Sequence, residues 1–318
     1  PFGSKNNLPL KLLEDAGIEY LINPLDKKLT ESELASMISD FDIIIAGTEI
    51  ISKKVMDMGI NLKMISRVGI GLDGVDLISA REKGIIVSYT PDAPAPAVSE
   101  LTIGMMLTLL RSVHVSNMQM HQGEWKRFFG RRLSECVVGV IGVGRIGKGV
   151  IEHLSAFNLK TILLNDIKSN DEYDEYDNIE WVDKETIYRE ADIITLHIPL
   201  TIKTKDMIRS AHLNSMKRDT IIINTARGGI INEDDLYTVM QEGHLSAAAI
   251  DVFNQEPYGG KLMEIERCLL TAHMGSMSID CRTEMEIKAT EEAVRFAKKE
   301  KLKSKVPEEE YLVQQEGL

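Results

Sequence analysis

The stretch VVGVIGVGRIGKGVIEHL, residues 137 to 154, decides the fold of this 318-residue chain. Its glycines, Gly142, Gly144 and Gly147, form the pattern G-x-G-x-x-G, which is weak evidence on its own. Here a β-branched run precedes the glycines and a stretch of helical period follows them. In such a unit the first glycine permits a tight turn, the second lets a pyrophosphate approach the backbone, and the third allows close packing of helix on strand. We therefore expect a dinucleotide cradle; the alternative is a purely structural turn.

An acidic residue follows the cradle at the distance expected for a ribose contact. The next apolar run ends at Asp166, which is 19 residues past Gly147. A carboxylate there accepts hydrogen bonds from the ribose hydroxyls and repels a 2′-phosphate, so NAD is favoured over NADP. Lys168 is near enough to soften that preference. The alternative for Asp166 is a helix cap or a turn residue.

Outward from this unit, short runs of Ile, Val and Leu alternate with stretches of helical period along the whole chain. The expected strands are Glu19–Ile22, Asp42–Ala46, Lys63–Val68, Ile85–Ser88, Val137–Ile141, Thr161–Leu164, Asp192–Leu196, Thr220–Asn224, Ala247–Val252 and Cys268–Thr271. The expected helices are Leu8–Asp15, Glu31–Ile38, Lys53–Met58, Val75–Lys83, Ser99–Leu110 and Arg282–Glu300. Such alternation predicts the α/β class, with two doubly wound domains whose parallel sheets are covered on both faces.

The domain junctions are visible in the composition. Thr90–Ala97 interleaves three prolines with alanines and is interpreted as a linker, and a second junction follows Gly275. We expect a dinucleotide-binding domain over residues 94–275 and a second domain from residues 1–93 and 276–318. The tail Lys301–Leu318 alternates blocks of charge and is expected to be solvated and partly mobile.

Composition excludes several classes of protein. The formal net charge of −12 argues against a nucleic-acid surface, which needs clustered Lys and Arg. The most apolar window, Leu101–Leu110, is about half the length of a membrane helix, and no secretory signal is visible. The three cysteines are widely separated and show no metal-ligand spacing, so no metal and a reducing, cytoplasmic compartment are expected.

Three polar residues lie just after expected strands. Arg227 lies in INTARGG (223–229), Glu256 in AIDVFNQEP (249–257) and His273 in LLTAHMGS (269–276). The carboxyl ends of the strands border the crevice in which a doubly wound sheet binds its ligand. An Arg there can clamp a carboxylate, a His can move a hydroxyl proton, and a Glu can orient the His and stabilise its charged form. Each residue alone could be structural, but together they suit hydride exchange with a hydroxy acid.

With these segments the chain resembles the D-isomer-specific 2-hydroxyacid dehydrogenases, and most of all the 3-phosphoglycerate dehydrogenase branch in a short form without regulatory domain. The other matching segments are SRVGIGLDGVDL (66–77), TPDAPAPAVSELTIGMML (90–107) and HIPLT (197–201). The resemblance implies a Rossmann cofactor domain and a flavodoxin-like substrate domain with the active-site cleft between them. It also implies NAD as cofactor and a homodimer formed through the region of the helix that begins at Ser99.

The resemblance implies a role for each matched residue. The catalytic residues would be Arg227, Glu256 and His273. The cofactor-binding residues would be Thr102, Gly142, Gly144, Arg145, Ile146, Gly147, Asp166, His197, Ile198, Pro199, Thr225, Ala226, Asp251 and His273, with Asp251 holding the nicotinamide carboxamide. The substrate-binding residues would be Arg67, Val68, Gly69, Ile70 and Arg227.

Within the substrate site, the backbone around Gly69 would bind the substrate carboxylate and Arg67 would bind a substrate phosphate. Lys126 and Arg127 resemble a basic segment that reaches across the dimer. The alternative is that Arg67 pairs with a carboxylate such as Asp73 and that the other two side chains are solvated.

The activity implied is NAD-dependent interconversion of a D-2-hydroxy acid and its 2-keto acid, with 3-phosphoglycerate or a related acid as substrate. Two alternatives stay open: a glyoxylate or hydroxypyruvate reductase, and a dinucleotide-sensing scaffold like the related transcriptional corepressors. The order of the Arg, Glu and His segments disfavours another Rossmann enzyme such as an adenosylhomocysteine hydrolase.

Two departures from the family pattern stand out. The family's first strand normally precedes the segment that begins here at Pro1, and without it the first domain would lack a central strand. Ser134–Glu135–Cys136 stands where the family usually has Gly-Lys-Thr, and we expect this difference to affect packing.

Overall fold

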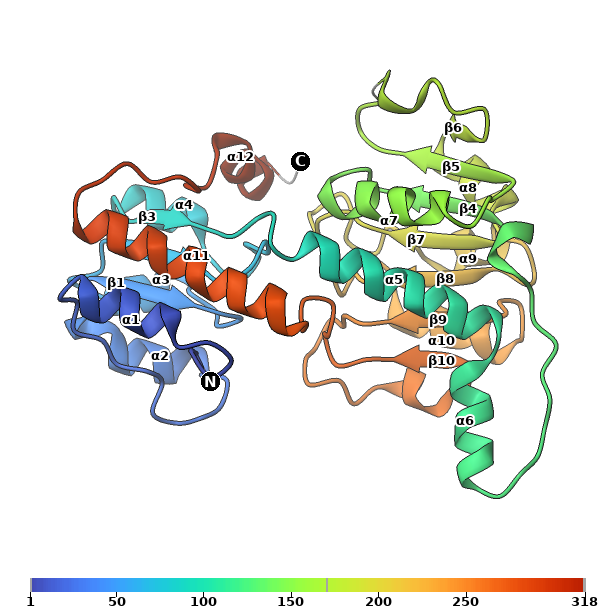
Figure 1. The fold of residues 1–318 in the computed structure, drawn as a ribbon, viewed down its shortest axis with the longest axis horizontal. Helices are drawn as coiled ribbons and strands as arrows, with labels where there is room; N and C mark the ends of the chain where they lie inside the picture. The colour runs from blue at the N-terminus through green and yellow to red at the C-terminus, as the bar shows by residue number, and fades with distance from the viewer. Residues whose placement is uncertain (1, 170, 317–318) are drawn as a thin grey trace. The chain divides into compact units, whose positions relative to one another are not determined.

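The computed structural model describes residues 2–169 and 171–316, and the chain divides into two compact units. Unit 1 comprises Pro1–Pro94 and Ser276–Leu318, and unit 2 comprises Ala95–Gly275 (Figure 1). This division lies one residue from the expected boundary between residues 93 and 94. Both units are built on parallel sheets with flanking helices, so the expected α/β class is confirmed. None of the helices in the described ranges combines the length and the apolar character needed to cross a bilayer.

Unit 2 is a doubly wound parallel sheet. Its strands are β4 (Val137–Ile141), β5 (Thr161–Asn165), β6 (Ile179–Trp181), β7 (Ile193–Leu196), β8 (Ile221–Asn224), β9 (Ala247–Ile250) and β10 (Cys268–Leu270). They lie in the order β10-β9-β8-β7-β4-β5-β6, and every pair is parallel. The chain runs outward from β4 to β6 and then returns to the other side of β4 at β7. The switch point therefore lies between β4 and β7, where a sheet of this kind binds its ligand.

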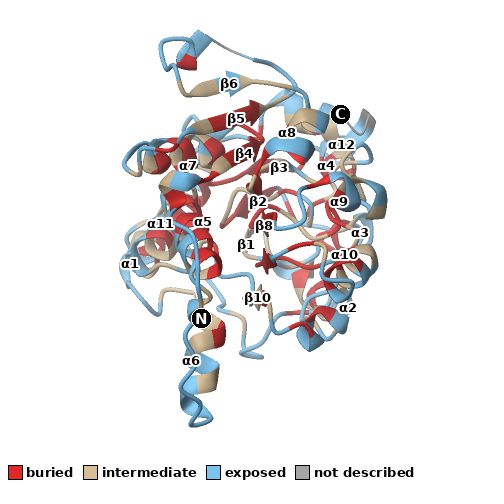
Figure 2. Cartoon of the chain, turned by 90° about the vertical axis from the view of Figure 1, so that its right-hand side faces the viewer, coloured by how far each residue is buried: buried red, intermediate tan, exposed pale blue. Residues whose placement is uncertain are grey.

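Helices cover both faces of this sheet. They are α5 (Ala95–Leu110), α6 (Val113–His121), α7 (Arg145–Ser155), α8 (Lys184–Glu190), α9 (Ser210–Ser215) and α10 (Glu233–Gln241). One apolar cluster joins the sheet to α5 and α7, and another joins it to α8, α9 and α10. Because both faces are covered, β7, β8 and β9 are buried along their whole length. In contrast, α6 and the segment after it project from the sheet and are largely exposed (Figures 1 and 2).

Unit 1 contains a smaller parallel sheet. Its strands β1 (Ile43–Ala46), β2 (Met64–Arg67) and β3 (Ile86–Ser88) lie in consecutive order. The helices are α1 (Leu8–Asp15), α2 (Glu31–Met37), α3 (Lys53–Met58), α4 (Leu77–Glu82), α11 (Ile279–Ala297) and α12 (Glu308–Glu316). The hydroxyl of Ser66 on β2 donates to the carbonyl of Ala289 on α11 over 2.8 Å, which ties α11 to one face. The main apolar cluster, with residues of α2, α3 and α4, lies on the other face.

The strand expected at Glu19–Ile22 does not form. Tyr20, Leu21 and Ile22 are all exposed, and no strand is assigned there. A strand needs a hydrogen-bonded neighbour, and β1 pairs only with β2 among the described strands. The sheet of unit 1 therefore has three strands in simple succession instead of the doubly wound order that was expected.

One helix boundary and one additional strand also differ from the expectation. Helix α5 begins at Ala95, inside the stretch interpreted as a linker, because the first turn of a helix tolerates Pro96 without losing a hydrogen bond. The short strand β6, with the polar Glu180 at its centre, was not anticipated.

The tail is docked instead of solvated and mobile. Val306 and Tyr311 are buried in the core of unit 1, and α12 forms there. The buried carboxylate of Glu292 accepts hydrogen bonds from the N–H groups of Lys303 and Ser304. Buried apolar side chains and a satisfied buried carboxylate hold the segment, although residues 317–318 lie outside the described residues.

Candidate active site

The glycine motif forms a cradle whose first and third glycines are required by the protein itself. A Cβ on Gly142, which has φ +97°, would lie 2.5 Å from the carbonyl oxygen of His197. A Cβ on Gly147 would lie 2.0 Å from the carbonyl oxygen of Gly142. Gly144 is different: it is the N-cap of α7, and nothing among the described residues lies within 4 Å of the position of its Cβ. The open space is thus at the positive end of a helix, where an anion is stabilised.

Asp166 lies beside this cradle. Its Oδ2 accepts a hydrogen bond of 2.6 Å from the N–H of Val143, and its Oδ1 accepts one of 2.6 Å from the N–H of Ile167. The carboxylate is therefore fixed at the end of β5, next to the glycine turn. This position fits the expected contact with a ribose.

The segment after β7 closes the other side of the glycine turn. The N–H of His197 donates to the carbonyl of Ile141 over 2.8 Å, and Ile198 and Pro199 follow. The His197 Nε2 lies 2.9 Å from the hydroxyl of Thr195, whereas its buried Nδ1 has no hydrogen-bond partner among the described residues. Burial lowers the pKa of His197 to about 3, so the ring is neutral near pH 7.

A pair of threonines joins α5 to the end of β8. The hydroxyls of Thr102 and Thr225 lie 3.0 Å apart, and both side chains are buried. Ala226 follows as a buried residue, and its carbonyl accepts a 2.6 Å hydrogen bond from Nη1 of Arg227. The structure therefore groups these expected residues at the carboxyl end of β8.

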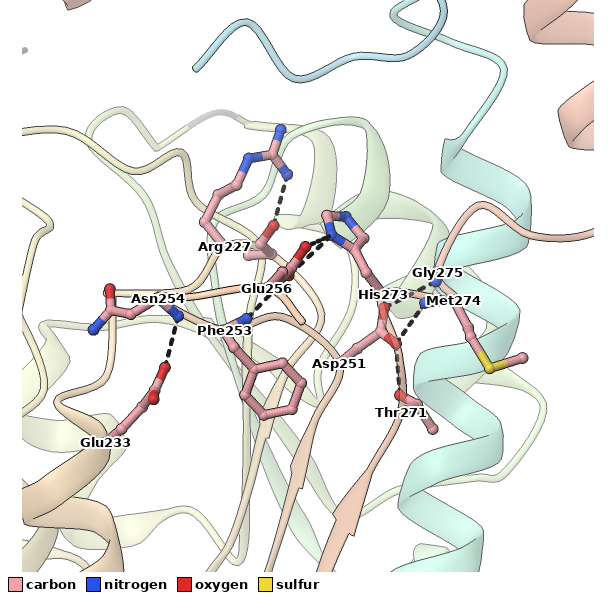
Figure 3. A network of polar contacts seen from close by, with 11 residues as sticks. Arg227, Glu233, Asp251, Phe253, Asn254, Glu256, Thr271, His273, Met274 and Gly275 are labelled. Carbon is pink, nitrogen blue, oxygen red and sulfur yellow. Dashed lines mark hydrogen bonds and ion pairs between the residues drawn. The ribbon is translucent and has the colours of Figure 1, made fainter. Parts of the chain in front are cut away.

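The side chains of His273 and Glu256 lie within ion-pair distance of each other, on the segments that follow β10 and β9 (Figure 3). The His273 Nδ1 lies 3.1 Å from Oε1 and 3.0 Å from Oε2 of Glu256. The two side chains are 44% and 31% exposed, so a ligand can reach them. With Nδ1 on the carboxylate, Nε2 is the nitrogen available to a substrate. Arg227, Glu256 and His273 follow β8, β9 and β10, which are adjacent in the sheet, so the topology brings all three residues to one edge.

Asp251 has a role that the sequence did not reveal. Its carboxylate is buried and accepts hydrogen bonds from the Thr271 hydroxyl (2.5 Å), the Met274 N–H (2.7 Å) and the Gly275 N–H (2.8 Å). Its carbonyl accepts a further bond from the His273 N–H over 2.8 Å. Asp251 thus shapes the turn in which His273 adopts φ +51° (Figure 3).

Glu233 on α10 is a second contributor that the sequence did not reveal. Its Oε1 accepts a 2.7 Å hydrogen bond from the N–H of Asn254. The neighbouring N–H of Phe253 donates to Oε1 of Glu256 over 3.2 Å (Figure 3). A Cβ on Gly228 would lie 2.1 Å from the Phe253 carbonyl, so the segments that carry Arg227 and Glu256 pack directly on each other. No sequence pattern signals these contacts, because they join distant segments.

The expected substrate residues of unit 1 lie at the end of β2. Arg67 is 6% exposed, and its guanidinium donates to the carbonyls of Ala46 (3.3 Å) and Gly71 (3.0 and 3.2 Å). The N–H of Val68 donates to the Ala46 carbonyl over 2.9 Å, and the N–H of Gly69 donates to the Thr90 hydroxyl over 2.7 Å. Arg67 therefore braces the loop that contains Val68, Gly69 and Ile70.

Lys126 and Arg127 lie in the exposed segment after α6, where the Lys126 Nζ is 5.3 Å from the centre of the Phe128 ring. Residues 2–169 and 171–316 contain no cluster of three His, Cys, Asp or Glu side chains that could hold a metal ion.

Comparison with known proteins gives a consistent result. Residues 103–275 match the family described as D-isomer specific 2-hydroxyacid dehydrogenase, NAD binding domain. The chain is 39% identical over 274 residues to a D-3-phosphoglycerate dehydrogenase of Methanocaldococcus jannaschii, covering 84% of this chain and 51% of that protein. It is 35% identical over 291 residues to a hydroxypyruvate reductase of Thermotoga maritima, covering 88% of this chain and 94% of that protein. The chain thus spans about half the length of the first relative and most of the second.

Solved structures agree with these matches. The TT0316 protein of Thermus thermophilus superimposes with a TM-score of 0.85 at 29% identity, covering 94% of this chain and 96% of that one. An NAD-dependent formate dehydrogenase of Staphylococcus aureus, in complex with NAD, superimposes with a TM-score of 0.84 at 27% identity, covering 96% and 93%.

Proposed function

Because the chain belongs to the D-isomer-specific 2-hydroxyacid dehydrogenases, we propose that it interconverts a D-2-hydroxy acid and its 2-keto acid with NAD. The observation that carries this proposal is the contact between His273 Nδ1 and the Glu256 carboxylate beside the segment of Arg227. These residues occupy the same sheet edge as the dinucleotide cradle after β4. A proton donor, a carboxylate clamp and a cradle on one edge are what reduction of a keto acid requires.

The cofactor has a defined place in this proposal. The N-terminus of α7 at Gly144 would hold the pyrophosphate, and Asp166 would accept hydrogen bonds from the adenosine ribose. Thr102, Thr225 and the His197 segment would line the rest of the site. NAD, when bound, supplies or takes up the hydride.

The protein's own residues bind the substrate carboxylate and transfer the proton. In the reductive direction, the Arg227 guanidinium holds the substrate carboxylate with two parallel hydrogen bonds. Protonated His273 gives its Nε2 proton to the oxygen that becomes the hydroxyl, and in oxidation it takes that proton back. Glu256 stabilises the imidazolium through Nδ1, and Asp251 keeps the His273 turn in place.

A turnover assay tests this proposal. The chain with NADH and a panel of 2-keto acids should consume NADH, followed by absorbance, and NADPH should be a poorer donor. His273→Ala should abolish most turnover, whereas the control His153→Ala, at the C-terminal end of α7, should not. NADH binding without turnover of any acid would refute the enzymatic proposal and favour the dinucleotide-sensing scaffold.

We also propose a homodimer that uses the projection after α5. Several large apolar side chains are exposed there, which is unusual for a surface that stays in water. They are Val113 (52%), Met118 (40%), Met120 (50%), Trp125 (83%) and Phe129 (105%). Light scattering at micromolar concentration should give the mass of a dimer, and Trp125→Ser with Phe129→Ser should give a monomer. A monomeric wild-type chain would contradict the proposal.

We also propose a cytoplasmic location, which the cysteines support. All three are buried free thiols, which suits a reducing environment such as the cytoplasm.

A further inference from the structure

Three loops follow the carboxyl ends of β1, β2 and β3 in unit 1, the edge that includes the expected substrate residues. These loops are GTEIIS (47–52), VGIGLDGVD (68–76) and YTPDAP (89–94). Together they contain four carboxylates and no Lys or Arg. Two cations adjoin these loops along the chain: Arg67, the last residue of β2, and Lys53, which begins α3 and lies 3.5 Å from Asp57 Oδ1.

Arg67 is committed to the protein's own backbone. It is buried, and its Nε, Nη1 and Nη2 all donate to the carbonyls of Ala46 and Gly71. Withdrawing them to bind a phosphate would leave buried carbonyls unsatisfied, and that penalty is comparable to the stabilisation that hydrogen bonds to the phosphate would provide. Arg67 is therefore a positioning residue for the loop that contains Gly69.

Glu49 differs from the other loop carboxylates. Asp76, for example, caps α4 by accepting from the N–H (2.8 Å) and the hydroxyl (2.7 Å) of Ser79. The Glu49 Oε2 is buried and has no hydrogen-bond partner among the described residues. A buried carboxylate oxygen without a donor is costly, so a group supplied by a ligand would be stabilising there.

Glu49 lies in the loop that is the immediate neighbour of the loop containing Gly69. Its Oε2 lies 3.4 Å from the position of a Cβ on Gly47, directly after β1. Ala46, the residue before Gly47, is the register partner of Arg67, and its carbonyl accepts from the N–H of Val68. The loop of Glu49 and the Gly69 loop, which the resemblance implies as a second contact of the substrate carboxylate, therefore follow adjacent, hydrogen-bonded strands.

We propose that Glu49 determines substrate specificity: it accepts a hydrogen bond from a hydroxyl or ammonium group on C3 of the 2-keto acid and excludes a phosphate at that end. This inference rests on the proposed function and narrows it to monoanionic substrates with a hydrogen-bond donor next to the keto group. A phosphate group would place roughly two negative charges beside the Glu49 carboxylate. The three loops contain no Lys or Arg that could balance these charges.

The test compares three substrates at saturating NADH: hydroxypyruvate, which carries a C3 hydroxyl; glyoxylate, which has no C3; and 3-phosphohydroxypyruvate. We expect kcat/KM of the wild type to be at least about tenfold higher for hydroxypyruvate than for 3-phosphohydroxypyruvate. Glu49→Ala should lower the hydroxypyruvate value about tenfold and leave the glyoxylate value within about threefold. Glu49→Gln keeps an acceptor without the charge, so it should retain most hydroxypyruvate activity and reduce the discrimination against the phosphate.

Two further variants separate specificity from structure. Arg67→Ala should lower kcat/KM for all three acids by a similar factor, as expected for a residue that braces the loop. Glu82→Gln, which removes an exposed charge at the end of α4, should leave the substrate ranking unchanged.

The outcomes that overturn the inference are distinct. A wild-type preference for 3-phosphohydroxypyruvate, or an equal loss for all three acids in Glu49→Ala, overturns it while the proposed function stands. Turnover of another 2-keto acid but of none of these three also overturns the inference alone, whereas no turnover of any acid in the full panel overturns the proposed function and this inference together.

Discussion

Replacing Gly144 with alanine separates what the cofactor requires of the glycine motif from what the fold requires. Gly144 has φ −79° and ψ −159°, a conformation open to alanine, and no atom of the described residues lies within 4 Å of the added Cβ. Gly147, three residues later, has a carbonyl oxygen 2.0 Å from that position. The same methyl group is therefore free at one site and blocked by backbone at the other.

The expected magnitudes follow from these distances. At a permissive position, Gly→Ala stabilises by about 0.4–1 kcal/mol through the unfolded state, so Gly144→Ala should raise Tm by roughly 1–4 °C. Gly147→Ala forces α7 away from the glycine turn, and overpacking of this kind costs about 1–3 kcal/mol, enough to lower Tm by several degrees. In Gly144→Ala the methyl group fills the space proposed for the pyrophosphate, so NADH should bind at least about tenfold more weakly, or about 1.4 kcal/mol.

Differential scanning calorimetry and NADH fluorescence titration measure the two effects separately. Gly259→Ala is the matched control, since its Cβ also meets no described atom within 4 Å but lies outside the cradle; it should bind NADH as the wild type does. If Gly144→Ala binds NADH with unchanged affinity, the pyrophosphate does not lie at the N-terminus of α7 and the reasoning fails.

Three further predictions concern the catalytic edge and its surroundings. His273→Ala should lower kcat/KM by about 10²–10⁴-fold with NADH affinity unchanged by titration, because the residue acts on the substrate proton; a loss below threefold would assign proton transfer to another group. Glu233→Ala removes the acceptor for the Asn254 N–H and should lower kcat about tenfold with little change in Tm or NADH affinity, because the loop of Glu256 loses its fixed position; unchanged kcat would show that α10 does not position it. The pKa of His197 is about 3 when folded and about 6.5 when unfolded, so the unfolded chain binds the proton first as pH falls. The free energy of unfolding should therefore drop by about 2 kcal/mol more between pH 7 and pH 5 in the wild type than in His197→Gln, as measured by urea denaturation; equal slopes would refute the buried neutral ring.

Apart from β6, the strands of unit 2 could be predicted closely because its sheet is covered on both faces. Buried parallel strands are continuous apolar runs, and β4 has the bounds expected for it. The same criterion failed at Glu19–Ile22, where an apolar run has no strand beside it among the described residues. Composition can indicate the tendency to form a strand, but pairing depends on a neighbour that composition does not specify.

The candidate site, like the fold, could be predicted only in part. The grouping of Arg227, Glu256 and His273 could be predicted because the carboxyl ends of parallel strands share one edge of the sheet. The residues that hold them could not: the three hydrogen bonds to Asp251 come from the turn after β10, and the contact of Glu233 joins α10 to the loop after β9. Such partners depend on tertiary geometry, and no local spacing encodes them.

Arg67 illustrates why cofactor is easier to infer than substrate in this fold. A guanidinium donates equally well to a phosphate and to backbone carbonyls, so an Arg before a glycine loop is compatible with both. Here Gly69 adopts φ +139°, and the Gly71 carbonyl accepts two hydrogen bonds from the Arg67 side chain. The loop conformation therefore decides what the arginine binds, while Glu49 keeps a buried acceptor that no described residue uses. The cofactor site is specified by a glycine motif that is contiguous in the sequence, whereas in our proposal substrate choice depends on which groups remain unsatisfied after the loops have folded.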